Sequence, residues 1–229
     1  MSIVPFLDKN GVTAYLGDCR QLMPQLDLSQ VKALISDPPY GIDWSPKQTV
    51  IKAREKKNHT PKRFVGKSVV MGDSEPFNPK HLLEFPVVVL FGANYYADKL
   101  PQSSGWIVWD KKDGERSMKF GDCEMIWTNQ PHPARLITHR WVGYRMGPET
   151  GVQRDHPTQK PLALMRALIE RYTNPGETIL DPYAGSGTTL RAAMDCGRKA
   201  IGLEIDPQYV AVIVKRLSQL VFGFEPETQ

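Results

Sequence analysis

The chain has 229 residues with a net charge of +4; 41% are hydrophobic and 24% charged, a composition typical of a globular protein with a single core. No apolar run approaches the roughly 20 residues that span a bilayer, and residues 1–10 lack a basic start followed by an apolar stretch, so we expect neither a membrane anchor nor a signal peptide. Cys19, Cys123 and Cys196 are scattered without a CxxC pair, which argues against a disulfide framework or a metal site and favours the cytoplasm.

Short apolar runs alternate with segments of helical spacing along most of the chain. Strands are predicted at residues 12–16, 31–36, 86–91, 106–109, 124–128, 178–180 and 199–203, and helices at 21–26, 161–172, 188–196 and 209–220. Residues 128–156 are rich in Pro, Gly, Arg and aromatic side chains, and we expect them to be irregular. This alternation predicts an α/β fold with a mainly parallel sheet.

The segment from Glu177 to Asp206 reads as strand, glycine turn, helix, strand and acid. Gly185 and Gly187 allow a tight turn and the close approach of a ligand, and Glu204 lies 19 residues after Gly185, near the offset at which an acid meets ribose hydroxyls. Leu190 stands where a dinucleotide-binding fingerprint has its third glycine, which argues against NAD and leaves room for a nucleoside without a pyrophosphate. A GxG pair by itself is more often a packing turn than a binding site.

Four motifs in the chain resemble those of the β class of DNA amino-methyltransferases. They are ILDPYAGSGTT at residues 179–189, HPTQKP at 156–161, GDC at 17–19 and DPPY at 37–40, with DPPY about 140 residues ahead of the glycine motif. The resemblance implies a Rossmann-like fold that binds S-adenosylmethionine, with a circularly permuted motif order. Because ligands bind at the carboxyl ends of parallel strands, both motifs would open onto one cleft if strands 31–36 and 178–181 are neighbours.

The resemblance also implies roles for individual residues. Those implied at the catalytic end are Asp37, Pro38, Pro39 and Tyr40, and those implied in cofactor binding are Asp18, Thr158, Lys160, Asp181, Pro182, Tyr183, Ala184, Gly185, Ser186, Gly187, Thr188, Thr189, Glu204 and Asp206. Asp18 has a second interpretation, as the cap of the helix predicted near Gln21.

The DPPY tetrapeptide suits chemistry on an exocyclic amino group, whose nitrogen is a poor nucleophile because its lone pair is conjugated with the base. A carboxylate and a backbone carbonyl that accept its two N–H bonds would free the lone pair, and the restricted backbone of Pro38 before Pro39 would aim the carbonyl. Tyr40 offers a ring for base stacking, worth about 1–3 kcal/mol. The tetrapeptide alone is as readily a turn that ends a strand.

The positive charge of the chain is concentrated directly after DPPY. Residues 46–67 hold eight Lys and Arg against one acid, whereas the rest of the chain holds 21 against 24. Phosphate contacts from such a segment would make DNA binding salt-dependent, and the target base would be flipped out of the duplex or lie in a single strand. The residues predicted to bind DNA are Lys47, Lys52, Arg54, Lys56, Lys57, Lys62, Arg63 and Lys67, with Arg135, Arg140 and Arg145 from a second basic and aromatic region. An isolated basic run is otherwise a solvated loop, and Trp141 is as readily a core residue as a DNA contact.

The predicted organisation is a single methyltransferase domain over residues 1–229, with a basic insert at 44–68 and a short target-recognition region at 111–155. Asp37 favours adenine-N6 as the target, since the cytosine-N4 members of the family more often have Ser there. Cytosine-N4 methylation is the alternative, and a catalytically inactive DNA-binding module is an alternative of another class. The sequence leaves open a homodimer, and it leaves open whether the chain serves restriction–modification or is a phage orphan in a bacterial or phage-infected cell.

Overall fold

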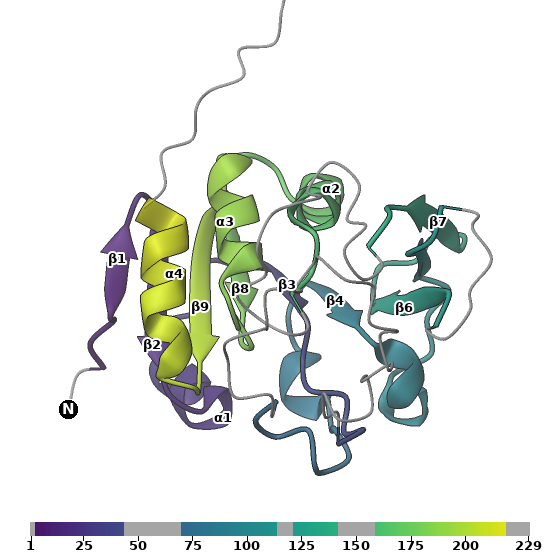
Figure 1. Cartoon of the computed structure of the whole chain (residues 1–229), viewed down its shortest axis with the longest axis horizontal. Coiled ribbons are helices and arrows are strands. Elements are labelled where there is room, and N and C mark those ends of the chain that lie inside the picture. Colours follow the sequence, from purple (N-terminus) through teal and green to yellow (C-terminus); the bar gives the residue numbers. More distant parts are fainter. Residues whose placement is uncertain (1–2, 44–69, 114–120, 142–158, 219–229) are drawn as a thin grey trace, which may run out of the picture.

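The computed structural model describes residues 3–43, 70–113, 121–141 and 159–218, and within these ranges the strands form one nine-stranded sheet (Figure 1). The strands are β1 (Leu7–Lys9), β2 (Val12–Leu16), β3 (Val31–Ser36), β4 (Val87–Phe91), β5 (Trp106–Asp110), β6 (Cys123–Thr128), β7 (Arg135–Thr138), β8 (Thr178–Asp181) and β9 (Lys199–Glu204). The α-helices are α1 (Cys19–Leu22), α2 (Leu162–Tyr172), α3 (Thr188–Asp195) and α4 (Gln208–Ser218). Short 3₁₀ turns lie at Met23–Gln25, Lys80–Leu82, Ala93–Tyr95 and Ala97–Lys99.

The order of the strands across the sheet is β1-β2-β9-β8-β3-β4-β6-β5-β7. The five strands from β2 to β4 in this order run parallel to one another, whereas β1 and β6 are antiparallel to their neighbours. β3 pairs directly with β8, with Leu34 opposite Leu180. The condition under which both motifs open onto one cleft is therefore met, and the DPPY and glycine motifs leave the same edge of the sheet.

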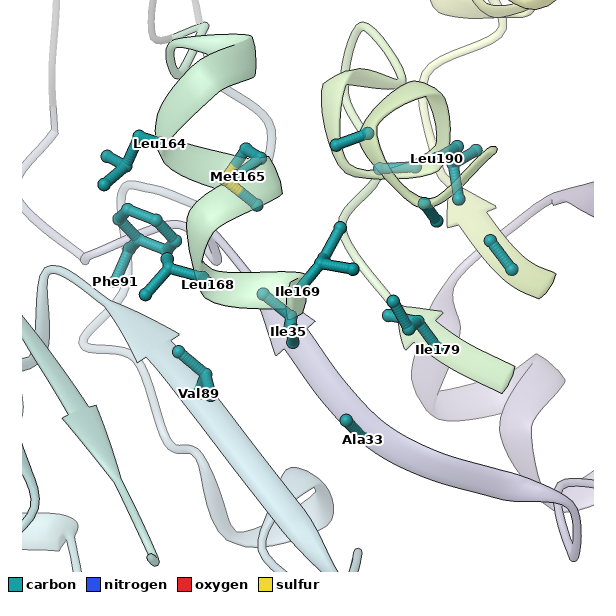
Figure 2. Close-up of a cluster of buried hydrophobic side chains, with 14 of the residues drawn as sticks. Ala33, Ile35, Val89, Phe91, Leu164, Met165, Leu168, Ile169, Ile179 and Leu190 are labelled. Carbon is teal, nitrogen blue, oxygen red and sulfur yellow. The ribbon is translucent and has the colours of Figure 1, made fainter. Parts of the chain in front are cut away.

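The central strands are apolar on both faces because both faces are covered. Figure 2 shows Leu164, Met165, Leu168 and Ile169 of α2 packed over Ala33, Ile35, Val89 and Phe91 of β3 and β4. α3 lies beside α2, and α4 lies on the far side of α3 (Figure 1). A second cluster of buried side chains, on the opposite face, includes Leu34, Val88, Leu90, Phe77, Leu82 and Tyr96. A strand buried on both sides reads as a continuous apolar run, which is why β3 and β4 were predictable.

The predicted elements are confirmed with three corrections. The helix predicted at residues 21–26 begins at Cys19, because Asp18 caps it there, and it ends at Leu22, after which the chain continues through Pro24 as a 3₁₀ turn. β7 lies inside the segment 128–156 that was expected to be irregular, and the short edge strand β1 was not predicted. Both of these missed strands lie at the two ends of the sheet and are largely exposed, so neither has an apolar pattern.

β6 and β7 belong to the main sheet although they lie within the region 111–155 expected to read the target sequence. Trp141, which by sequence could be either a core residue or a DNA contact, is buried in the core. Its indole N–H donates to the carbonyl of Gln159 at 3.0 Å. None of the helices that the structure describes is long and apolar enough to cross a membrane.

Candidate active site

A cavity of about 1340 Å³ lies at the carboxyl edge of the central strands. Its walls contain both motifs: Asp37, Pro38, Pro39 and Tyr40 after β3, and Asp181, Pro182, Tyr183, Ala184, Gly185, Ser186, Thr188 and Thr189 after β8. Asp18, Lys160, Glu204 and Asp206 also line it. The structure therefore brings together every predicted catalytic residue and nearly every predicted cofactor residue within the described ranges. Gly187, the remaining one of these, is buried at the start of α3.

The glycine turn after β8 has the geometry that only glycine adopts readily. The φ angles of Gly185 and Gly187 are +52° and +76°. A Cβ on Gly187 would lie 3.1 Å from Cγ1 of Ile213 in α4, so this glycine also allows close packing of the turn against that helix. The turn leads directly into α3 at Thr188.

Glu204 at the end of β9 is tied to the glycine turn. Its Oε2 accepts a 2.6 Å hydrogen bond from the backbone N–H of Gly185, and its Oε1 accepts one of 2.8 Å from the backbone N–H of Asp206. The residue is only 7% exposed, and burial raises the pKa of the carboxyl to about 7, although the two hydrogen-bond donors by themselves would lower it. Each carboxylate oxygen keeps a second lone pair, so Glu204 can accept two further donors from a ligand in the cavity.

Asp181 at the end of β8 joins the two motifs. Its Oδ1 accepts from the hydroxyl of Ser36 at 2.6 Å and from the backbone N–H of Tyr183 at 3.1 Å. Burial raises the pKa of Asp181 to about 6. Ser36 is the residue directly before Asp37, so this pair holds the start of DPPY against the start of the glycine motif.

Asp37 and Tyr40 meet the ammonium group of Lys160. Lys160 Nζ lies 2.6 Å from Asp37 Oδ2 and donates to the Tyr40 hydroxyl at 3.0 Å, while that hydroxyl donates to Asp37 Oδ1 at 2.5 Å. Burial raises the pKa of Asp37, and the Lys160 ammonium opposes this rise. Burial by itself would lower the pKa of Lys160, but the neighbouring carboxylates outweigh this effect, and the pKa lies above its ordinary value. The Lys160 side chain thus lies at the catalytic end of the cavity.

Two side chains that the sequence did not single out complete this cluster. Glu124 at the start of β6 has its Oε1 2.7 Å from the Tyr40 hydroxyl and 3.1 Å from Lys160 Nζ. Its Oε2 lies 2.6 Å from Nζ of Lys111, which follows β5. A lone acid at a strand end and a lysine near it give no local pattern, so only the three-dimensional contact reveals them.

The ring of Tyr40 is enclosed by two residues that follow β4. The rings of Tyr40 and Tyr95 are stacked with centroids 5.3 Å apart and planes at 14°. Gly92 lies so close that a Cβ there would be 2.1 Å from Cε1 of Tyr40. Tyr95 is 52% exposed and lines the cavity, so the stack lies at its solvent side.

The remaining predicted residues fall into three groups. Asp18 caps α1, and its carboxylate holds Arg20 at 2.7 Å, while Asp206 accepts from the backbone N–H of Gln208 at 2.9 Å. Arg135 on β7 is exposed and Arg140 half-buried, and neither is among the residues that line the cavity. Outside the described residues lie Thr158, Lys47, Lys52, Arg54, Lys56, Lys57, Lys62, Arg63, Lys67 and Arg145.

Among the described residues, no group of three or more His, Cys, Asp or Glu side chains could hold a metal ion.

Residues 106–215 match a family model described as DNA methylase, which covers the adenine-N6 and cytosine-N4 enzymes. A DNA adenine methyltransferase of Escherichia coli K12 is 49% identical over 63 residues, which is 28% of this chain and 21% of that protein. A type II methyltransferase of Moraxella bovis, M2.MboI, is 31% identical over 127 residues, 56% of this chain and 45% of that protein. The matches therefore span less than half the length of these curated relatives.

Solved structures agree with the fold. The cytosine-N4-specific PvuII DNA methyltransferase superposes with a TM-score of 0.60 at 16% identity, over 96% of this chain and 90% of that one. The complex of M1.HpyAVI with S-adenosylmethionine superposes with a TM-score of 0.52 at 22% identity, over 91% of this chain and 100% of that one. The architecture is thus the Rossmann-like fold of methyltransferases. Within that class, the chain is similar to the DNA methylase family over residues 106–215.

Proposed function

We propose that the chain transfers a methyl group from S-adenosylmethionine to N6 of adenine in DNA. The observation that carries this proposal is the pairing of β3 with β8, which opens Asp37–Tyr40 and the Asp181–Thr189 turn onto one cavity. A methyl transfer needs the donor and the acceptor nitrogen side by side, and holding them so removes much of the barrier. In this proposal, Asp37–Tyr40 form the end of the cavity for the acceptor nitrogen, and the Asp181–Thr189 turn forms the end for the methyl donor.

The end of the cavity at β8 and β9 fits a nucleoside cofactor. Glu204 is a buried carboxylate with free lone pairs that suits a pair of ribose hydroxyls. The glycine turn leaves room for close approach of the ligand to the backbone at Gly185. Ser186 and Thr188, whose hydroxyls accept from Arg216, suit the polar methionine part. When bound, the cofactor supplies an electrophilic methyl group on a sulfonium.

Asp37 would activate the target amino group. In the proposed step, the carboxylate of Asp37 and the carbonyl of Pro38 accept the two N–H bonds, and the nitrogen lone pair attacks the methyl carbon. The new N–C bond forms as the S–C bond breaks, with its electron pair left on sulfur. The nitrogen becomes positively charged, is stabilised by the Asp37 carboxylate, and loses a proton to it. Lys160, 2.6 Å from Asp37 Oδ2, orients the carboxylate and opposes the rise in its pKa that burial causes.

The target base must reach Tyr40, whose ring is stacked on Tyr95 in this structure. A flipped base would therefore take the place of Tyr95, which is half-exposed, or enter between the two rings. Either arrangement gives the base an aromatic surface at the catalytic end. Phosphates beside it would be held by the basic segment 46–67 together with Arg135 and Arg140, in the cytoplasm of a bacterial or phage-infected cell. A homodimer is compatible with this reading and is not required by it.

Adenine is favoured over cytosine by the aspartate in Asp37-Pro38-Pro39-Tyr40 and by the named adenine methyltransferase among the relatives. Cytosine-N4 is the second candidate, because a solved structure of similar fold is a cytosine-N4-specific enzyme.

Mass spectrometry of nucleosides from unmethylated bacterial DNA, incubated with the protein and S-adenosylmethionine, decides between them. We expect N6-methyladenine with the wild type and none with Asp37→Ala. N4-methylcytosine in place of N6-methyladenine would establish the alternative target. Methylation by neither protein would favour the inactive DNA-binding module, whose DNA affinity a salt titration would then reveal.

A further inference from the structure

Glu124 is a buried acid at the catalytic end that no motif accounts for. It is 8% exposed, and its carboxylate contacts Tyr40, Lys160 and Lys111. Burial by itself would raise the pKa of Glu124, but the two lysines outweigh this effect and lower the pKa to about 2. The carboxyl is therefore ionised at neutral pH. A buried charge is costly unless it is paired, and the two lysines supply that pairing for Glu124.

The ionic groups of the cluster balance one another. Within the described ranges, Asp37 and Glu124 contribute two negative charges, and Lys111 and Lys160 two positive ones. Lys160 lies between the acids, 2.6 Å from Asp37 and 3.1 Å from Glu124. Without Glu124 the cluster would hold one uncompensated positive charge, and Lys160 would have Asp37 as its one ionic partner among these four groups.

Charge balance matters in this position because of how charge moves in the reaction. Positive charge leaves the sulfonium and develops on the target nitrogen beside Asp37. An uncompensated ammonium next to that nitrogen opposes the change, and low local polarity makes the opposition strong. It also draws the Asp37 carboxylate away from the N–H bonds that it should accept. The negative charge of Glu124, 3.1 Å from Lys160 Nζ, counteracts both effects.

We infer that Glu124 is a positioning residue that holds Lys160 against Asp37 and cancels one of the two positive charges of Lys111 and Lys160 in the transition state. This inference rests on the proposed methyl transfer. Glu124 acts through its contacts with Lys160 and Tyr40. The cofactor binds at the end of the cavity that β8 and β9 form, so its binding should not depend on Glu124.

The test compares Glu124→Gln, Lys111→Met and the double variant in a methyl-transfer assay on unmethylated bacterial DNA. Glu124→Gln keeps the shape of the side chain and leaves a net positive charge, so we expect kcat to fall by about 10- to 100-fold. The KM for S-adenosylmethionine should change by less than about threefold. Removing Lys111 as well restores the balance, so the double variant should recover most of the lost kcat. Glu170→Gln, which removes the same charge from the exposed side of α2, is the control.

Each outcome decides the point. A normal kcat in Glu124→Gln, or a double variant slower than Glu124→Gln, overturns the inference, since a packing role predicts that losses accumulate. Methyl transfer by none of the proteins overturns the proposed function and this inference with it. Thermal unfolding of each variant shows whether it folds. If Glu124→Gln does not fold, Lys111→Met alone decides, because a fall in its kcat of tenfold or more contradicts the charge argument.

Discussion

Ser36 Oγ donates a 2.6 Å hydrogen bond to Asp181 Oδ1, although 145 residues separate the two side chains in the sequence. Ser36 is fully buried at the end of β3 and Asp181 is buried at the end of β8. The bond therefore fixes the relative position of the two motifs that line the cavity. Burial raises the pKa of Asp181 to about 6, which means that the charged form is costly and that the Ser36 hydroxyl offsets part of this cost.

Ser36→Ala should therefore destabilise the protein in a pH-dependent way. A folded-state pKa above the unfolded value means that stability is lost as pH rises through about 6, and removing the donor enlarges that loss. We expect the free energy of unfolding to fall by about 1–3 kcal/mol at pH 8, with a smaller fall at pH 5, where Asp181 is protonated. Denaturant unfolding at the two pH values measures this.

Ser29→Ala is the matched control for that change, because Ser29 donates an equally short 2.6 Å bond to Asp27 at an exposed site. We expect it to change the free energy of unfolding by less than about 0.5 kcal/mol. Equal effects of the two substitutions would contradict a special role for the Ser36–Asp181 pair.

Gly92→Ala should displace Tyr40 from the catalytic cluster. Its Cβ would lie 2.1 Å from Cε1 of Tyr40, and the ring cannot stay where it is. A misplacement of about 1 Å can cost on the order of 100-fold in rate, so we expect a loss of kcat of that size. The affinity for S-adenosylmethionine, measured by calorimetry, should change little because Glu204 is untouched.

Gly176→Ala separates this clash from backbone strain. Gly176 also has a positive φ, +84°, but a Cβ there meets nothing within 4 Å. Both variants carry the cost of a left-handed residue, about 1–2 kcal/mol, and Gly176→Ala should keep its kcat. A similar kcat in the two variants would show that the position of Tyr40 does not limit the reaction.

Glu204 should make cofactor binding depend on pH. Its pKa near 7 means that the free protein carries a protonated carboxyl in acid, which cannot accept two hydroxyl donors. We expect the Kd for S-adenosylmethionine to be constant above pH 8 and to rise by nearly tenfold per unit below about pH 6.5. Glu204→Gln should bind more weakly at pH 8 and lose most of this slope. Asp181 titrates near pH 6 in the same cavity, so a smaller slope there is expected to remain. An unchanged slope in Glu204→Gln would exclude Glu204 as its source.

The parts of the fold that the sequence predicted are those set by local patterns. Buried strands such as β4 read as apolar runs, and the glycine turn has its own spacing. The edge strand β7 was missed because its side chains are largely exposed and carry no alternation. Glu124 and Lys111 were missed for a different reason. Their role depends on contacts with Tyr40 and Lys160, far away in the chain, and neither has a pattern in its own segment.

Tyr95 should contribute to binding of the target base. It stacks on Tyr40 with ring centroids 5.3 Å apart and is half-exposed, so an incoming base exchanges one aromatic contact for another or gains a second one. Stacking on an aromatic side chain is worth about 1–3 kcal/mol, which corresponds to a rise of about 5- to 150-fold in the KM for DNA in Tyr95→Ala. Tyr95→Phe keeps the ring and should stay close to wild type, as should the KM for S-adenosylmethionine in both variants. Steady-state methylation of a DNA fragment whose modified positions have been mapped provides these constants. If Tyr95 only blocks the entrance, Tyr95→Ala will instead lower the KM for DNA, and the stacking role is then wrong.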